Sequence, residues 1–232
     1  MKPTPRFRGP SLILLATVHL LLFAAGFAAA AALRHGAPFA TPFATGEALR
    51  AFLALSPAAV RVSNFFLLGS AVPFGIFAVT TVSRLRFMGV RAAGTNIALL
   101  GGLITTIALI LSSSVGWILS VPEVLASTAL VKAVSFLNFL LGGVVFAVGF
   151  GLFAAGVSVT CYFMRLLPRW LVALGMLVAL AGELSSISLI AYPANFFIPF
   201  TRFVGFIWML SVAVALTGNR NAAQAAHAGD SA

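Results

Sequence analysis

Two charged residues, Glu183 and Arg202, lie inside long apolar stretches of the sequence, where a charge must be solvated or compensated. Residues 170–191 contain the carboxyl group, and residues 196–216 contain the guanidinium group. Because only a short connection separates the two stretches, we expect antiparallel helices that bring the two charges to a similar depth. An ion pair compensates both charges at the lowest free-energy cost. The sequence therefore predicts that Arg202 pairs with Glu183.

Uncharged polar residues in corresponding parts of the apolar stretches extend this pair into a candidate polar cluster; they are Asn64, Ser113, Asn138 and Ser186. The cluster has two interpretations. It can fix the register of packed helices through hydrogen bonds. It can also bind a small solute or carry a proton, since ionisable groups in apolar helices are functional candidates. A water-accessible cavity indicates the second role, and a closed ion pair indicates the first.

Other chemistry is not indicated by the residue types. The sequence contains no paired carboxylates, Ser-His-Asp set, phosphate-binding loop or metal-ligand spacing, and its one cysteine is Cys161. His19 is the one histidine inside an apolar stretch, so haem ligation by a second histidine at matched depth is not expected. We expect His19 to be a hydrogen-bonded packing residue. The sequence thus gives no indication of an enzyme, a metal or a cofactor.

The composition places these residues in a membrane protein. Of 232 residues, 61% are hydrophobic and 8% are charged, and the mean hydropathy is +1.11. A soluble domain of this length could not cover such a composition with polar surface. Six stretches reach the roughly 20 apolar residues that a transmembrane helix needs. They predict an all-α bundle of six transmembrane helices over residues 11–33, 60–82, 96–119, 134–157, 170–191 and 196–216.

The first stretch, residues 11–33, has a second interpretation. The basic segment before it and the small residues at its end resemble a signal peptide. Its apolar length exceeds the roughly 7–15 residues usual for a signal peptide, so we expect a retained helix. Cleavage would leave five spans.

The basic residues predict the orientation of the bundle. With the N-terminus inside, nine of them fall on the cytoplasmic side and five on the outer side, which places both termini in the cytoplasm. The net charge of +10 does not point to nucleic acid, because the basic residues punctuate apolar stretches rather than cluster on a polar segment. The expected surroundings are a lipid bilayer, with a membrane-protein partner or a second copy of the chain as further possibilities.

Small residues at regular spacing predict where helices pack closely, since helices in lipid associate through close contact at small residues. On the fourth stretch they recur every seven residues, at Ser135, Gly142, Gly149 and Gly156. On the fifth stretch they alternate in steps of four and three, at Gly175, Ala179, Gly182 and Ser186. Both seams are expected to be interfaces within one chain.

Two segments outside the spans have distinct expectations. Residues 46–55 predict a short amphipathic helix in the first outer loop, with Leu49, Phe52 and Leu53 on one face. We expect it to lie on the bilayer surface, and the alternative is a lid over a substrate site. Residues 218–232 contain too few apolar side chains to pack and are expected to form a disordered cytoplasmic tail. The remaining residues, 1–217, then form a single transmembrane domain.

Residues 150–184 resemble a family of uncharacterised bacterial multi-pass membrane proteins. In that family a Gly-rich helix ends in a short basic turn before a helix rich in Leu, Gly and Ala, and the matching residues here are Leu167, Pro168 and Arg169. The resemblance implies about six helices and a bacterial cytoplasmic (inner) membrane. It implies no activity and no catalytic residues.

The sequence as a whole favours an integral membrane protein with a structural or partner-binding role, in which the polar cluster specifies the fold. The alternative is a small-solute or proton-linked transporter or channel that uses Glu183 and Arg202 in a polar cavity of the outer half.

Overall fold

The computed structural model describes residues 9–33 and 41–229, with side chains described as far as residue 217. The described residues form helices and no strand. In chain order the elements are α1 (Leu12–Leu33), α2 (Gly46–Leu55), α3 (Pro57–Phe87), α4 (Ala93–Ile118), α5 (Pro122–Leu125), α6 (Thr128–Phe139), the π-helix η1 (Leu140–Val145), α7 (Phe146–Phe163), α8 (Arg169–Leu184), the 3₁₀-helices η2 (Ser185–Leu189) and η3 (Tyr192–Phe196), and α9 (Phe197–Gly229).

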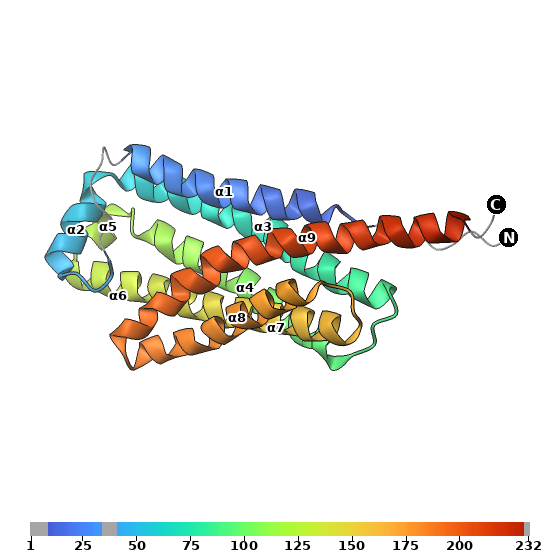
Figure 1. Ribbon diagram of the computed structural model, residues 1–232. Coiled ribbons are helices and arrows are strands. Elements are labelled where there is room, and N and C mark those ends of the chain that lie inside the picture. The colour runs from blue at the N-terminus through green and yellow to red at the C-terminus, as the bar shows by residue number, and fades with distance from the viewer. Residues whose placement is uncertain (1–8, 34–40, 230–232) are drawn as a thin grey trace.

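Six of the described helical segments are long and apolar enough to cross a membrane, which confirms the expected bundle. The fourth of them, Thr128–Phe163, is built from α6, η1 and α7 without a break. α1 begins and α9 ends at the same end of the bundle (Figure 1). α2 lies across the opposite end, which we call the α2 end.

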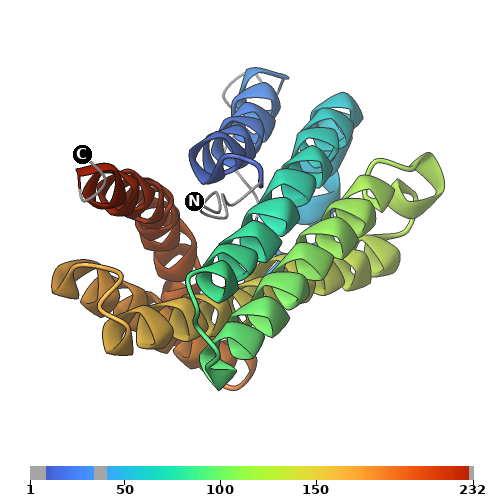
Figure 2. The same ribbon diagram turned by 90° about the vertical axis from the view of Figure 1, so that its right-hand side faces the viewer.

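The long helices pack in an order that differs from their order in the sequence. α4 packs between α3 and α7, and α8 lies against α7. α1 packs mainly on α3, and α9 contacts α8 and reaches back to α1 (Figure 2). Helices α3, α4, α7 and α8 therefore form a continuous row. α1 and α9, which contact each other, pack against the two ends of this row.

The small residues of the fourth span lie against α4. A Cβ atom added to Gly149 would lie 2.8 Å from Ile104 Cγ2 and 2.9 Å from the backbone nitrogen of Thr105. At Gly156 the added atom would lie 2.6 Å from the carbonyl oxygen of Gly94. α4 contributes its own small residues to this contact, so the two backbones touch where side chains would otherwise separate them.

The small residues of α8 lie against α7 and α9. A Cβ atom on Gly182 would lie 2.9 Å from Gly151 Cα, and one on Gly175 would lie 2.9 Å from Trp208 Cε2. Ser186 departs from the expected seam, because it is exposed on η2. The change from α-helix to 3₁₀-helix at Ser185 alters the angle between successive side chains, and this takes Ser186 off the α8 face.

α2 begins and ends where the sequence predicts, at Gly46 and Leu55, and the Thr45 hydroxyl caps it by accepting from the Ala48 amide. The expectation that α2 lies on the bilayer surface is wrong. Its Leu49 and Leu53 are buried in a small second core with the following side chains: Val60, Leu119 and Val131. α2 therefore covers the end of the bundle.

The last helix is longer than the apolar pattern indicates. Its backbone is helical through Gly229, whereas the span was expected to end at Leu216 and the tail to be disordered from residue 218. The segment beyond Gly218 is rich in alanine, the residue with the highest helix propensity, which favours continuation of the helix. Residues 230–232 lie outside the described residues.

His19 is buried in the main core, as a packing residue should be. It donates from Nδ1 to the carbonyl oxygen of Ser70 at 2.8 Å. Its ring lies 5.3 Å from that of Phe74 and 5.5 Å from that of Phe206, measured between centroids. A hydrogen bond and aromatic contacts thus hold the imidazole.

Candidate functional site

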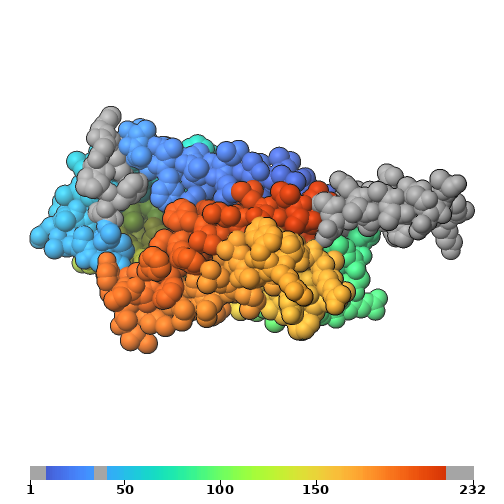
Figure 3. Space-filling view, in the orientation of Figure 1, coloured from blue at the N-terminus to red at the C-terminus, as the bar shows by residue number. Residues whose placement is uncertain are grey.

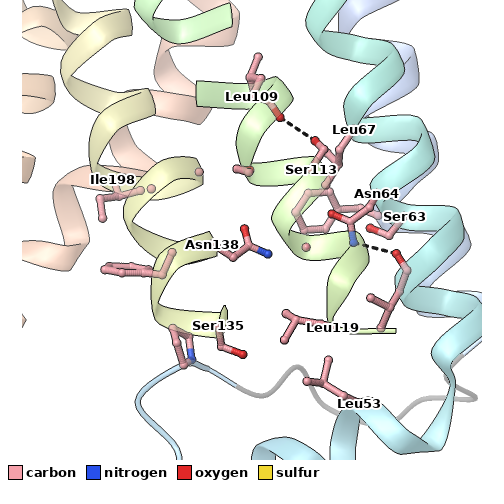
Figure 4. A pocket seen from close by; sticks show the side chains of 18 of the residues that line it. Leu53, Ser63, Asn64, Leu67, Leu109, Ser113, Leu119, Ser135, Asn138 and Ile198 are labelled. Atoms are coloured by element: carbon pink, nitrogen blue, oxygen red, sulfur yellow. Dashed lines mark hydrogen bonds between the residues drawn. The ribbon is translucent and has the colours of Figure 1, made fainter. Parts of the chain in front are cut away.

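A cavity of about 380 Å³ lies inside the α2 end of the bundle (Figure 4). Helices α1, α2, α3, α4, α6 and α9 and the π-helix η1 all contribute to its wall. Its polar lining side chains come from five separate places in the sequence: Ser63 and Asn64, Ser112 and Ser113, Ser135, Asn138, and Arg202. Three of the four uncharged residues of the candidate cluster, Asn64, Ser113 and Asn138, therefore line the same cavity as Arg202.

The side-chain amides of Asn64 and Asn138 converge above Gly116 of α4. A Cβ atom at Gly116 would lie 2.7 Å from Asn138 Nδ2 and would meet Asn64 Oδ1 at still closer range. Asn64 also donates from Nδ2 to the carbonyl oxygen of Val60 at 2.8 Å, which fixes its orientation (Figure 4). Gly116 is thus the position that lets two amides from α3 and α6 meet across α4, and no pattern in the sequence indicates it.

The serines of the cavity differ in what they offer a ligand. Ser113 donates to the carbonyl oxygen of Leu109 at 2.7 Å, so its hydroxyl hydrogen is already used. Ser135 is buried, and its Oγ has no hydrogen-bond partner among the described residues. A buried hydroxyl without a partner carries a desolvation cost that a bound polar group would relieve.

Arg202 of α9 is the one charged side chain among the described residues that line the cavity. Its Nη2 donates to the carbonyl oxygen of Gly142, and its Nε is buried without a hydrogen-bond partner. The guanidinium carbon lies 4.3 Å from the centroid of the Phe146 ring and 5.6 Å from that of Phe23. Two aromatic rings and one carbonyl therefore hold the cation, without a carboxylate.

The π-helix η1 explains how a backbone carbonyl becomes a partner of Arg202. It contains Gly142 and Gly143, both of which line the cavity. π-helical segments replace the usual i to i−4 hydrogen bonds and occur frequently at functional sites. Gly142 was expected only as a packing residue, and it does contact Ser112 of α4. The sequence gives a weak signal for the second role, the pair of consecutive glycines.

The predicted ion pair between Glu183 and Arg202 is wrong. Glu183 is exposed, and no carboxylate in the described part of the chain forms an ion pair with Arg202. On α8 Glu183 follows the exposed side chains of Leu177 and Leu180, so it points away from the bundle, while Arg202 points into it. The expectation rested on depth along the helices, and the helical angle between the two side chains overrides it.

Ser186 is also separate from the cavity. It is exposed on η2 and donates from its hydroxyl to the carbonyl oxygen of Glu183 at 2.6 Å. The connection to α9 is made by η2 and η3 rather than by the tight hairpin expected. Glu183 and Ser186 thus belong to the outward surface of α8 and η2.

α2 and the segment before it close the cavity at the α2 end. Leu49, Phe52 and Leu53 of α2 line the cavity, together with Pro42. Lys132 of α6 ties this segment down by donating to the carbonyl oxygen of Pro42 at 2.7 Å and to that of Ala44. The end wall is therefore apolar and held in place by a lysine.

The side of the molecule has a hollow at the α2 end, the end where the cavity lies. In Figure 3 it lies between α1, α2 and the first part of α9, and residues from the middle of the chain form its floor. The cavity-lining side chains of these bordering helices include Phe27 of α1 and Ile198 of α9. Both side chains are apolar, Phe27 being exposed and Ile198 buried, and we call the two the apolar rim.

The described residues contain no group of three or more His, Cys, Asp or Glu side chains that could hold a metal ion. The chemistry of the cavity is that of hydrogen-bond donors and acceptors and one cation. Comparison of this chain with family models, with curated proteins and with solved structures gives no match.

Proposed function

We propose that this multi-pass membrane protein binds a small solute in the cavity at the α2 end and acts as a small-solute carrier. The carrying observation is the convergence of Asn64, Asn138, Ser135 and Arg202 on one cavity from three helices, α3, α6 and α9. Its volume, about 380 Å³, falls within the range of roughly 300–1,000 Å³ found for ligand pockets. An apolar wall with few convergent polar groups is typical of such pockets.

A purely structural role for Arg202 receives less support from the geometry. That role required a closed ion pair with Glu183, and Arg202 instead lines a cavity with a free Nε. A charge left without a counter-charge inside a bundle is costly, and intramembrane charges are commonly functional for that reason. In the cavity interpretation, the charge of Arg202 serves to bind a solute.

We further propose that the protein resides in a bacterial cytoplasmic membrane with both termini in the cytoplasm. The nine-to-five distribution of basic residues supports this orientation, and the family resemblance at Leu167, Pro168 and Arg169 supports the membrane. In this orientation the α2 end is the outer end. The cavity then lies in the outer half of the bilayer.

Thiol accessibility tests the proposed binding cavity. In a Cys161→Ala background, which removes the one native thiol, Asn138→Cys is compared with Ala108→Cys, a buried position of α4 that does not line the cavity. We expect N-ethylmaleimide, a small uncharged reagent that reaches protein thiols from water and from the bilayer, to modify the Asn138→Cys variant much faster. Equal rates for the two variants would show that no solute reaches the cavity and would refute the proposal.

A second candidate function is partner binding through the outward face of α8. Glu183 places a carboxylate between exposed Leu180 and Ile187, on a face that no other described helix covers at these residues. A carboxylate facing lipid is unfavourable, whereas pairing with a basic side chain on a neighbouring helix compensates it. The charge therefore points to a transmembrane helix with a lysine or arginine at matching depth.

A photocrosslinking amino acid at Leu180 tests this second function. The expected result is an adduct with a second protein in native membranes, lost in Glu183→Gln and retained in Glu123→Gln, an exposed carboxylate elsewhere. An adduct of twice the chain's own mass identifies a second copy instead. No adduct, or one that Glu183→Gln leaves intact, overturns the partner proposal.

A further inference from the structure

We propose that the ligand of the cavity is an amphipathic anion, a carboxylate or phosphate that carries an apolar chain, and that Arg202 binds the anionic group. This inference rests on the proposed function and names the class of solute. It predicts that the ligand enters sideways from the bilayer, between α1 and α9.

The charge of the cavity is the first argument. Arg202 is its one charged side chain among the described residues, and the described acidic residues, Glu47, Glu123 and Glu183, are all exposed elsewhere. A cationic ligand finds no counter-charge there. An anion supplies the charge that Arg202 lacks, and arginine binds carboxylate and phosphate groups through paired N–H donors.

The orientation of the guanidinium group is the second argument. The guanidinium carbon lies over the ring of Phe146, 4.3 Å from its centroid, and over the ring of Phe23, 5.6 Å from its centroid. Aromatic rings stabilise the face of a guanidinium group and leave its edge to form hydrogen bonds. Gly142 takes Nη2 of that edge, and Nε has no partner. The edge therefore still has donors for an anion.

The apolar wall is the third argument, and it decides between a water-borne anion and a lipid-like one. The end of the cavity that would face water is covered by Leu49, Phe52 and Leu53 of α2, tied down through Lys132. The helices that border the hollow in Figure 3, α1 and α9, line the cavity with the apolar side chains of Phe27 and Ile198. An apolar chain fits this side opening, because burying it against the rim gains about 25 cal/mol per Å².

The polar groups beyond Arg202 complete the fit. Asn64 and Asn138 hold their amides over Gly116 toward the α2 end, and the Ser135 hydroxyl has no partner. Asn138 Nδ2 and the Ser135 hydroxyl offer donors to the further oxygen atoms of a carboxylate or phosphate, while the chain leaves through the apolar side. One cavity thus separates a place for the head group from a place for the tail.

Direct binding of tritiated dodecanoate tests the inference. The probe is added to full-length protein in nanodiscs of phosphatidylcholine alone, with dodecyl phosphate, dodecanol and acetate as competitors. We expect saturable binding, competition by dodecyl phosphate, and little competition by dodecanol or acetate. Arg202→Gln should weaken binding by about thirtyfold or more, the equivalent of the roughly 2 kcal/mol or more lost with a buried charged partner.

Matched variants control for charge and for folding. Arg61→Gln removes an arginine that binds Ser120 outside the cavity, so its dodecanoate affinity should equal that of the wild type. Arg202→Lys keeps the charge and should bind more tightly than Arg202→Gln. The thermal midpoint of each variant shows whether it is folded. If the Arg202→Gln variant is unfolded, the affinity of the Arg202→Lys variant is compared with that of the wild type instead.

Each other outcome overturns a defined part of the proposal. If dodecanol competes as well as dodecyl phosphate, the anionic group is not required for binding. If acetate competes as well as dodecyl phosphate, the apolar chain is not required. If the folded Arg202→Gln variant binds dodecanoate as tightly as the wild type, Arg202 does not bind the anionic group. If the Asn138→Cys thiol is accessible but no probe binds saturably, the cavity is open to another class of solute, and this inference fails while the proposed function stands.

Discussion

The guanidinium carbon of Arg202 lies 4.3 Å from the centroid of the Phe146 ring, one residue beyond the end of η1. The two residues are far apart in the sequence and belong to different spans. Their contact replaces the ion pair that the sequence predicted as the means of holding the arginine.

We expect a measurable free-energy coupling between these two residues. A double-mutant cycle of Arg202→Met and Phe146→Leu should give about 0.5–2 kcal/mol, the usual size of a desolvated cation–π interaction. Chemical denaturation in mild detergent measures it. The control cycle pairs Arg202→Met with Phe77→Leu, a buried ring without a contact to the guanidinium group, and should give no coupling. Equal coupling in both cycles would contradict the contact.

Glu183 and Arg202 should show no coupling. Because the carboxylate is exposed on α8 and the guanidinium group lines the cavity, the double variant Glu183→Gln/Arg202→Gln should change stability by the sum of its parts to within about 0.5 kcal/mol. The same denaturation assay decides the question. A coupling of several kcal/mol, as in a buried ion pair, would show that the two side chains meet after all.

Gly149→Ala should destabilise the protein although alanine favours helices. The added Cβ atom would lie 2.8 Å from Ile104 Cγ2 and 2.9 Å from the Thr105 backbone, so α4 and α7 must separate, at about 1–3 kcal/mol. Gly69→Ala is the matched control, because its Cβ atom meets its nearest neighbour, Leu22 Cδ1, at 3.9 Å. That variant should be neutral or gain up to about 1 kcal/mol. Equal thermal midpoints would mean that the seam is not a close contact.

Reporter fusions should place Phe43 on the opposite side of the membrane from Arg91 and Gly218. Six spans put both ends of the bundle on one side, and the basic residues put that side in the cytoplasm. Alkaline phosphatase should be active at Phe43 and inactive at the other two positions. Activity at Gly218 together with Phe43 would rule out an even number of spans.

The sequence predicts the architecture well because apolar length alone specifies it. The six spans and the helix at residues 46–55 follow from runs and periodicity that a local pattern records. The depth of a residue along a span also follows from counting residues in the sequence, and this predicts that Asn64, Ser113 and Asn138 are neighbours. The angle at which a side chain leaves a helix depends on packing, and here it separates Glu183 from the cluster.

The remaining features of the cavity depend on the three-dimensional positions of atoms, which a pattern of residue types does not record. The π-helix at residues 140–145 exposes a carbonyl, and Gly116 matters because nothing stands between two amides there. Phe146 and Phe23 read in the sequence as ordinary apolar residues. Only the arrangement of the helices turns them into the surroundings of a cation.

The position of Arg202 in the last span has a consequence for how the chain is made. A growing chain delivers its spans to the membrane in order, and an arginine near the middle of a helix raises the insertion free energy by about 2.5–3.5 kcal/mol. The residues that receive this arginine, Gly142 and Phe146, belong to the fourth span and have entered the membrane earlier. The sixth span can therefore place its arginine against these partners only after the fourth span is in the membrane, and the cavity takes shape when the sixth span packs.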